Sequence, residues 1–320
     1  MSQIAVTGAT GVVGKALLRH VQAAGMRGVA LSRQATPHAS ANLTRQVDLH
    51  RPQRLGQALA GCNIVVHLAG AIEGSAAELY RANVLATKNL VEAARAEQVE
   101  CFVHVSSAGV YGERAGDLPF TESSTPNPQT DYERSKLDGE HAVIDTLAQT
   151  RTRFVLLRPT GVFADERAAS IRFLREILER KWWLHAPPRL LVHPLPVDDL
   201  CRAIRLAIAR PLPSGTLLNI AGERAIFLDE WIDLLARSAG SGLRQLRLGG
   251  RAVRITAQGI TTLADRLHVP VPARLRRATQ ASMSRAVSIE RARDLLGYDP
   301  QPLAAAAEAI VARILARPSA

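Results

Sequence analysis

The chain is poor in cysteine, in aromatic residues and in lysine. Its 320 residues contain three cysteines, Cys62, Cys101 and Cys201, whose wide spacing matches no metal-ligand motif. An odd cysteine count without a pattern is typical of a protein kept in a reducing cytosol. We therefore expect no bound metal and a cytoplasmic location.

Long apolar runs are also missing. No stretch of 18 apolar residues occurs, so a membrane span is not expected, and the first residues lead directly into a strand-like run without a secretory signal. Nevertheless 47% of the residues are hydrophobic, and this is enough for a sizeable core. At this length we expect one large domain with a smaller lobe.

The net charge of +11 comes almost entirely from arginine, because only four of the 40 basic residues are lysines. Such a charge attracts anionic ligands, but we attribute the total to an arginine-favouring genome, which the Ala-rich and Pro-rich composition also suggests. The surplus is concentrated in residues 241–295, where 11 arginines face three acidic residues. No aromatic residue lies among them, so we do not expect a nucleic-acid surface, and we expect no membrane partner.

Strand-like and helix-like segments alternate through the first half of the chain. This alternation, with continuously apolar strands, predicts an α/β fold: a Rossmann-type, doubly wound parallel sheet with helices on both faces and a smaller C-terminal lobe. The predicted strands cover 4–7, 28–32, 46–49, 63–68, 101–106 and 154–158. The predicted helices cover 12–24, 76–97, a segment that follows Thr130, 198–209, 228–238 and 303–316, with another near 168–181.

A glycine-rich turn connects the first strand to the first helix. Its sequence, Gly8-Ala9-Thr10-Gly11-Val12-Val13-Gly14, follows a strand and opens a helix, which is the context that gives such a turn meaning. Glycines allow the backbone to approach a diphosphate closely, and the helix N-terminus offers N–H groups to its charge. The turn therefore predicts a dinucleotide site.

A second set of residues carries hydroxyl and ammonium groups. Tyr132 and Lys136 are four positions apart on a predicted helix that begins with the capping box Thr130 and Glu133, so the two side chains share a face. They follow a Ser-Ser pair at the end of an apolar strand by 25 residues.

The spacing Gly-x-x-Gly-x-x-Gly, the segment Val105-Ser106-Ser107-Ala108-Gly109-Val110-Tyr111-Gly112 and the Tyr-x-x-x-Lys pair together resemble the extended short-chain dehydrogenase/reductase family, in its epimerase/dehydratase branch. The resemblance implies that Ser107, Tyr132 and Lys136 are catalytic. A positive charge beside the phenol would favour phenolate for proton exchange with a hydroxyl or ketone oxygen, and Ser107 would hold that oxygen.

The same resemblance implies the cofactor site. No carboxylate follows the second strand, where Leu31-Ser32-Arg33 stands; Arg33 could pair with a 2′-phosphate, so NADP is expected, with NAD as the alternative. The candidate cofactor-binding residues are Gly8, Thr10, Gly11, Val12, Val13, Gly14, Arg33, Asp48, Leu49, Leu68, Ala69, Gly70, Asn83, Tyr132, Lys136 and Pro159.

Later segments resemble the family over nearly the whole chain. We expect the cofactor domain to comprise residues 1–160 plus 197–222 and the substrate lobe 161–196 plus 223–320, with the active site between them. The resemblance also implies a homodimer that uses the Tyr132 helix and the helix at 76–97.

The substrate remains open at this point. The leading interpretation is a nucleotide-sugar 4-epimerase or ketoreductase; the alternative is an NADPH-dependent ketoreductase of a less polar, steroid-like, phenolic or polyketide-derived molecule. Ala108-Gly109 replace the Asp-Glu pair of sugar dehydratases, which disfavours dehydration. The basic insert at 241–283, with Arg244 and Arg251, could hold a diphosphate or form a solvated helix face. A non-catalytic nucleotide sensor is the third alternative.

Two other features lie in the predicted lobe. Trp182-Trp183 with Pro187-Pro188 could cover the ligand or pack between lobes, and His193 is expected to be structural.

Overall fold

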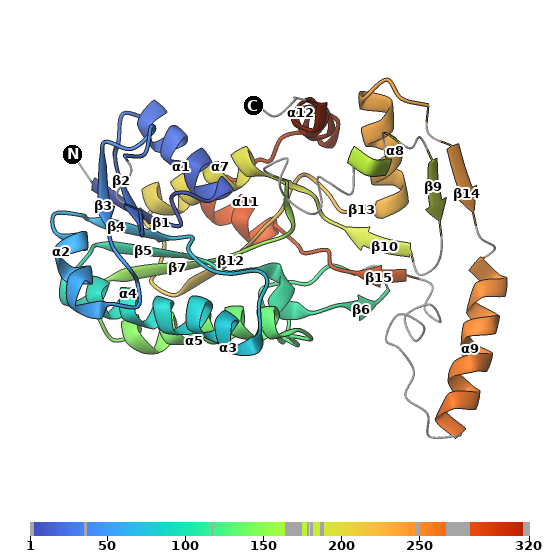
Figure 1. The fold of residues 1–320 in the computed structure, drawn as a ribbon, viewed down its shortest axis with the longest axis horizontal. Helices are drawn as coiled ribbons and strands as arrows, with labels where there is room; N and C mark the ends of the chain where they lie inside the picture. The colour runs from blue at the N-terminus through green and yellow to red at the C-terminus, as the bar shows by residue number, and fades with distance from the viewer. Residues whose placement is uncertain are drawn as a thin grey trace.

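A computed structural model shows a parallel sheet of seven strands in the order β12-β7-β5-β4-β1-β2-β3 (Figure 1). It describes residues 3–34, 37–116, 118–163, 175–177, 179, 182–185, 189–242, 244–247, 250–266 and 282–315. The strands are β1 (Gln3–Thr7), β2 (Arg27–Ser32), β3 (Leu43–Gln46), β4 (Ile64–His67), β5 (Cys101–Val105), β7 (Arg153–Pro159) and β12 (Thr216–Ile220). The predicted Rossmann-type sheet is confirmed.

Helices cover both faces of this sheet (Figure 1). One face is covered by α1 (Val12–Ala23), α7 (Val197–Ala209) and α11 (Glu290–Leu296). The other is covered by α2 (Leu55–Leu59), α3 (Ala76–Tyr80), α4 (Ala86–Ala96) and α5 (Asp131–Leu147). Alternate residues of β1 point to opposite faces, so Ile4 and Val6 pack with α1 while Ala5 packs with α4 and α5.

Two expected boundaries need correction. The third strand occupies Leu43–Gln46 and not 46–49, because Val29–Ser32 pair with Leu43–Gln46. The helix predicted at 76–97 contains a π-helical turn at Arg81–Leu85 between α3 and α4. Such turns are common at functional sites, and periodicity alone does not reveal them.

A smaller lobe lies beside the carboxyl ends of the strands (Figure 1). Its main sheet has the order β13-β10-β15-β6, and β6 comes from the segment between β5 and α5. Its elements are β6 (Arg114–Ala115), β8 (Val162–Phe163), β9 (Trp182–His185), β10 (Arg189–Val192), β11 (Leu195–Pro196), β13 (Ile226–Phe227), α8 (Leu228–Ser238), β14 (Arg244–Arg247), α9 (Gly250–Arg266), β15 (Ser282–Ser284) and α12 (Leu303–Leu315).

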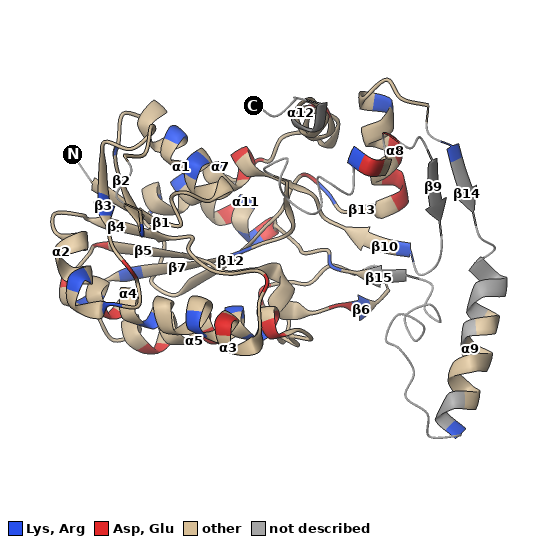
Figure 2. Cartoon of the chain, in the orientation of Figure 1, with Lys and Arg blue, Asp and Glu red and all other residues tan. Residues whose placement is uncertain are grey.

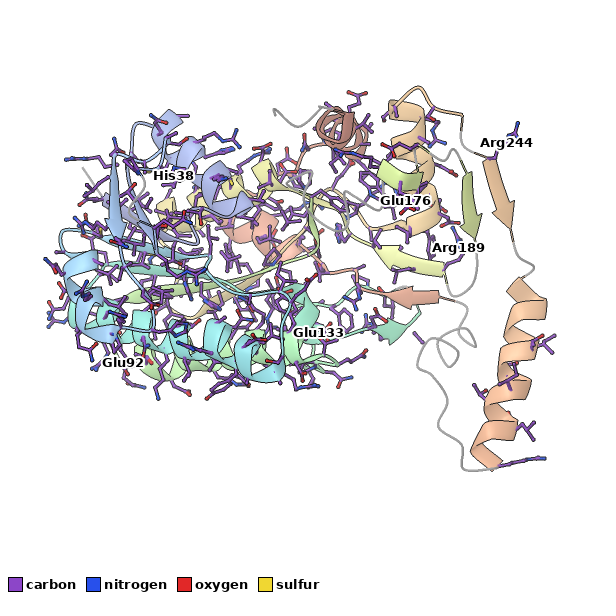
Figure 3. All side chains as sticks on the ribbon, viewed as in Figure 1. His38, Glu92, Glu133, Glu176, Arg189 and Arg244 are labelled. Atoms are coloured by element: carbon purple, nitrogen blue, oxygen red, sulfur yellow. The ribbon has the colours of Figure 1, made fainter. Side chains whose placement is uncertain are left out.

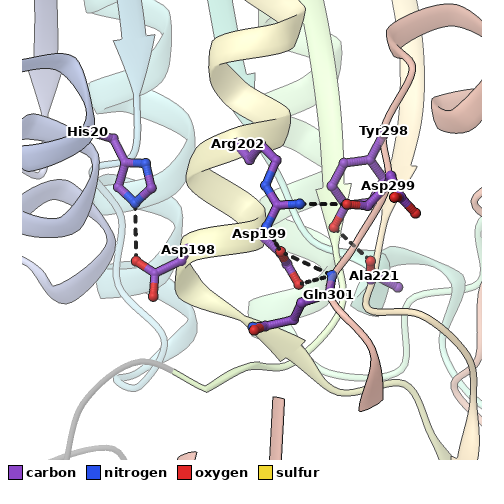
Figure 4. Close-up of polar contacts among 8 residues, drawn as sticks. All are labelled: His20, Asp198, Asp199, Arg202, Ala221, Tyr298, Asp299 and Gln301. Carbon is purple, nitrogen blue, oxygen red and sulfur yellow. Dashed lines mark hydrogen bonds and ion pairs between the residues drawn. The ribbon is translucent and has the colours of Figure 1, made fainter. Parts of the chain in front are cut away.

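Hydrogen bonds hold the segment near the C-terminal end of the chain against the large domain (Figure 4). The buried Asp199 accepts hydrogen bonds from Arg202 at 2.6 Å and from the backbone N–H of Gln301 at 3.2 Å. Tyr298 donates to the carbonyl of Ala221 at 2.8 Å. These bonds connect α7 and β12 to the segment that leads into α12.

Charge is spread over the described surface. Figure 2 shows Lys and Arg interspersed with Asp and Glu along α3, α4 and α5. Within the described residues, no helix is both long enough and apolar enough to cross a bilayer.

Candidate active site

The glycine turn between β1 and α1 is closely packed. Gly8 has φ +64°, and a Cβ atom there would lie 2.8 Å from the backbone nitrogen of Ala69. A Cβ on Gly14 would lie 2.2 Å from the carbonyl oxygen of Gly8. Because Gly11 caps α1 without a side chain, N–H groups of the first turn stay available, and Val12 lines the adjoining cavity. This geometry fits a diphosphate.

A buried histidine fixes the turn after β4 against this loop. His67 Nε2 lies 2.9 Å from Thr87 Oγ1, whose hydroxyl already donates to the Asn83 carbonyl, so Nε2 must carry the proton. Nδ1 therefore accepts from Thr7 Oγ1 at 2.7 Å. Thr7 in turn accepts from the backbone N–H groups of Leu68 and the residue after it, at 3.1 and 3.2 Å. Burial, together with the nearby charge of Lys136, lowers the pKa of His67 to about 3.

Asn83 lies in the π-helical turn and joins it to α5. Its amide oxygen accepts from the N–H of Ala71 at 2.8 Å, and its amide nitrogen donates to the Ala71 carbonyl at 2.9 Å and to Ser135 Oγ at 2.8 Å. A Cβ on Gly70 would lie 2.6 Å from this amide oxygen. Asn83 therefore shapes the cavity wall, and its polar atoms are engaged by the protein.

The three predicted catalytic residues come together. Ser107 follows β5 and accepts a hydrogen bond from the N–H of Gly109 at 3.0 Å. Tyr132 and Lys136 lie on α5, whose capping box of Thr130 and Glu133 is present as predicted. Figure 3 marks Glu133 at the end of α5 near the small lobe. The Ser107 hydroxyl lies close enough to the Tyr132 phenol to influence its pKa.

Burial dominates the electrostatics of this set. It raises the pKa of the Tyr132 phenol, which the Ser107 hydroxyl lowers. It also lowers the pKa of Lys136 to about 8, against the carboxylate of Glu140, which raises it. The Lys136 ammonium donates to the carbonyl of Val105 at 2.9 Å. Lys136 is therefore mostly charged at neutral pH and loses its proton at mildly alkaline pH.

Ser107, Tyr132 and Lys136 line a cavity of about 620 Å³ between the sheet and the small lobe. Of the candidate cofactor residues, those along its wall are Gly8, Gly11, Val12, Val13, Gly14, Leu68, Gly70, Asn83, Tyr132, Lys136 and Pro159. The remaining candidates, Thr10, Arg33, Asp48, Leu49 and Ala69, do not line it.

The candidates outside the cavity lie after the carboxyl ends of β2 and β3 or beside the glycine turn. Arg33 is exposed at the end of β2, and its carbonyl accepts from the Gln46 side chain. The carboxylate of Asp48 accepts from the N–H of His50 at 3.0 Å, and the carbonyl of Leu49 accepts from Asn89.

The far end of the cavity contains residues that were not assigned to the site from sequence. His193 lines it, with Nε2 donating to the carbonyl of Gly222 at 3.0 Å, and burial lowers its pKa to about 4. Arg285 also lines it, and its guanidinium donates to Glu113 at 2.6 Å. Only its position after the basic segment signalled a role for Arg285.

The basic insert is not one helix, since β14 precedes α9. The backbone of Trp182-Trp183 forms part of β9, which pairs with β14, while both tryptophan side chains, the Arg251 side chain and Pro187-Pro188 lie outside the described part.

A model of the NAD dependent epimerase/dehydratase family matches residues 4–221. The chain belongs to this family. It is therefore an NAD(P)-dependent enzyme of the epimerase/dehydratase type, and the expected family and fold are confirmed.

Curated relatives include a ketoreductase from Stigmatella aurantiaca that acts on a 4-hydroxy-2-methyl-3-oxo-4-farnesyl-3,4-dihydroquinoline-1-oxide. It is 27% identical over 244 residues, which is 73% of this chain and 72% of the relative. The sterol demethylase protein B of Methylococcus capsulatus is 35% identical over 149 residues, covering 43% of this chain and 45% of the relative.

Solved structures with the same fold include the UDP-N-acetylglucosamine 4-epimerase of Bacillus cereus. It has a TM-score of 0.77 and 21% identity, and the match covers 100% of this chain and 98% of that one. A putative epimerase from Burkholderia cenocepacia gives a TM-score of 0.77 at 23% identity, covering 99% of both chains. At such identities the likeness establishes the fold alone.

Proposed function

We propose that this enzyme is an NADP-dependent ketoreductase that transfers hydride to or from a hydroxyl or ketone carbon of a largely apolar small molecule. The observation that carries the proposal is the meeting of Ser107, Tyr132 and Lys136 in a cavity whose lining is mainly apolar. The cofactor, when bound, supplies or accepts the hydride.

The three side chains divide the remaining work. Ser107 Oγ holds the substrate oxygen beside Tyr132 Oη, and the phenol gives the oxygen its proton during reduction or takes it during oxidation. Lys136 lies on the same helix face, one turn further along α5, and its ammonium favours the phenolate and binds the nicotinamide ribose. Burial raises the pKa of the phenol, so a nearby positive charge is needed for phenolate to form.

The apolar side chains of the cavity lining favour an apolar substrate. They include Val162, Phe163 and Val192 from the small lobe, together with Ile72 and Leu200. A nucleotide sugar carries a diphosphate, which calls for cations that are not already paired. Among the described lining residues on this side, the cation is Arg285, and it is bonded to a glutamate. The quinoline-oxide ketoreductase and sterol demethylase names of two relatives agree with this substrate class.

Basic groups near the expected position of the cofactor's adenosine ribose support NADP. Arg33 is exposed after β2, and no acidic residue accompanies it in Ser32-Arg33-Gln34. His38 interacts with the backbone of Ala9 and lies close enough to Lys15 on α1 for the lysine's positive charge to act on it. Arginine and lysine in this region suit a 2′-phosphate, whereas a carboxylate would suit a ribose hydroxyl.

The deciding experiment identifies any nucleotide that co-purifies and then titrates the protein with NADPH and NADH. We expect an empty site that binds NADPH more tightly, and NADPH oxidation with apolar ketones such as steroid or polyketide-like ketones. Tyr132→Phe is the matched control. Tightly held NAD⁺ together with turnover of UDP-sugars would instead identify a nucleotide-sugar 4-epimerase, and cofactor binding without turnover of either class would favour a sensor.

We also propose a homodimer through α3, α4 and α5. Tyr80 on α3 and Ile144 on α5 are large apolar side chains that remain 48% and 37% exposed. Sedimentation equilibrium should give twice the chain mass, and Ile144→Lys should shift the species toward the monomer. A monomeric wild-type protein would refute this assembly.

A further inference from the structure

His104 on β5 is an unusual buried residue. It is 1% exposed, and among the described residues neither ring nitrogen has a hydrogen-bond partner. A buried polar atom without a partner destabilises the folded state, so an apolar ring would be the more stable choice at this position. Packing alone therefore does not explain why an imidazole occupies this position.

The ring lies under the catalytic face of α5. Nε2 lies 3.8 Å from the Cβ position of Gly139, which is one helical turn from Lys136. On the other side His104 faces His67, with ring centroids 5.4 Å apart. Both nitrogens of His67 are already bonded to threonines, so of these two rings only His104 has a nitrogen to offer Lys136.

The ammonium of Lys136 can donate three hydrogen bonds. It donates one of them to the carbonyl of Val105, the residue after His104. The titratable groups that interact with its charge are Glu140 on α5 and the two histidines on β4 and β5, and Tyr132 lines the same cavity. Glu140 is itself held by the guanidinium of Arg158, at 2.9 and 2.6 Å.

We propose that His104 is a positioning residue for Lys136: its unprotonated ring nitrogen accepts a hydrogen bond from one water molecule that in turn accepts from the ammonium. The other two ammonium hydrogens then serve the Val105 carbonyl and the nicotinamide ribose. The inference rests on the role proposed for Lys136. An acceptor aimed at the ammonium favours its charged form and fixes its position beneath Tyr132.

The test compares His104→Phe, which keeps a ring without nitrogens, with His104→Gln, which keeps an acceptor. For His104→Phe we expect a thermal midpoint at or above wild type. We also expect kcat/KM about tenfold lower, the loss typical of one hydrogen bond to a charged group. Because Lys136 then loses its proton more readily, the alkaline inflection of the pH profile moves to lower pH. His104→Gln should restore much of the rate and the inflection.

The inference is wrong if His104→Phe keeps the wild-type rate and inflection, or if both variants lose activity only in step with a lower thermal midpoint. Should His104→Phe not fold, histidine ¹⁵N NMR of the wild-type protein decides. The His104 ring should stay neutral while its signal follows a titration near pH 8 that is absent in Lys136→Met, and an unresponsive signal refutes the bond. An active Tyr132→Phe would refute the proposed function, whereas the NMR result tests the bond independently.

Discussion

Acid should destabilise this protein through histidines that are buried in the neutral form. The pKa of His67 is lowered to about 3 and that of His193 to about 4, chiefly by burial, while an unfolded histidine has a pKa of about 6.5. Below pH 6.5 the unfolded chain therefore binds more protons than the folded one. Stability is fully present above pH 6.5 and is lost as the pH falls toward 4 and then 3.

The size of the loss follows from the same values. At pH 5 the unfolded state gains about 2 kcal/mol from protonating each of these histidines, and the folded state gains almost nothing. His67 and His193 together should thus remove about 4 kcal/mol between pH 7.5 and pH 5, a large part of a typical total stability of about 5–15 kcal/mol. His104, whose pKa is also well below its usual value because of burial, acts in the same direction.

Urea unfolding followed by tryptophan fluorescence at pH 7.5 and pH 5.0 measures this loss. His67→Gln should lower stability at both pH values, because the bridge between Thr7 and Thr87 is lost, but its difference between the two pH values should shrink by about 2 kcal/mol. The exposed His141 provides the control, as His141→Gln should leave the difference unchanged. A wild-type difference under about 1 kcal/mol, or an undiminished difference in His67→Gln, would refute the reasoning.

Four further changes test other parts of the structure. Tyr132→Phe should abolish turnover while NADPH fluorescence titration still shows binding; retained turnover would contradict the assignment. Arg33→Ala should weaken NADPH binding about tenfold and NADH binding little, because one phosphate contact is lost, and equal effects would end the NADP argument. Gly14→Ala places a methyl group against the preceding loop, so cofactor binding and the thermal midpoint should both fall. Glu140→Gln leaves the buried Arg158 unpaired and should cost about 3–5 kcal/mol in chemical unfolding, whereas Glu140→Met with Arg158→Met should recover most of it; a double variant as unstable as the single one would argue against this.

The sequence alone determined the local features of the fold. The strand-turn-helix at Gly8–Gly14, the capping box before Tyr132 and the period of the apolar residues each depend on near neighbours, and these features appear where they were predicted. The i,i+4 spacing of Tyr132 and Lys136 likewise fixed their common helix face before any tertiary contact was known.

Tertiary structure decided whatever depends on contacts between distant segments. Pairing with β2 placed the third strand earlier than apolarity suggested, because edge strands take their register from a neighbour and not from their own residues. The π-helical turn at Asn83 follows from its bonds to Ala71 and Ser135, the latter 52 positions away.

The chemical character of the site also came from burial. Local sequence could not show that His104 has no hydrogen-bond partner among the residues that the structure describes, or that Arg285 is bonded to a glutamate 172 positions away. These contacts depend on how β5, α5 and β15 pack, and the pKa of a side chain depends on that packing because burial removes the water that would stabilise its charge. The sequence determined which groups are available, and the packing determined which of them are charged, paired or open to a ligand.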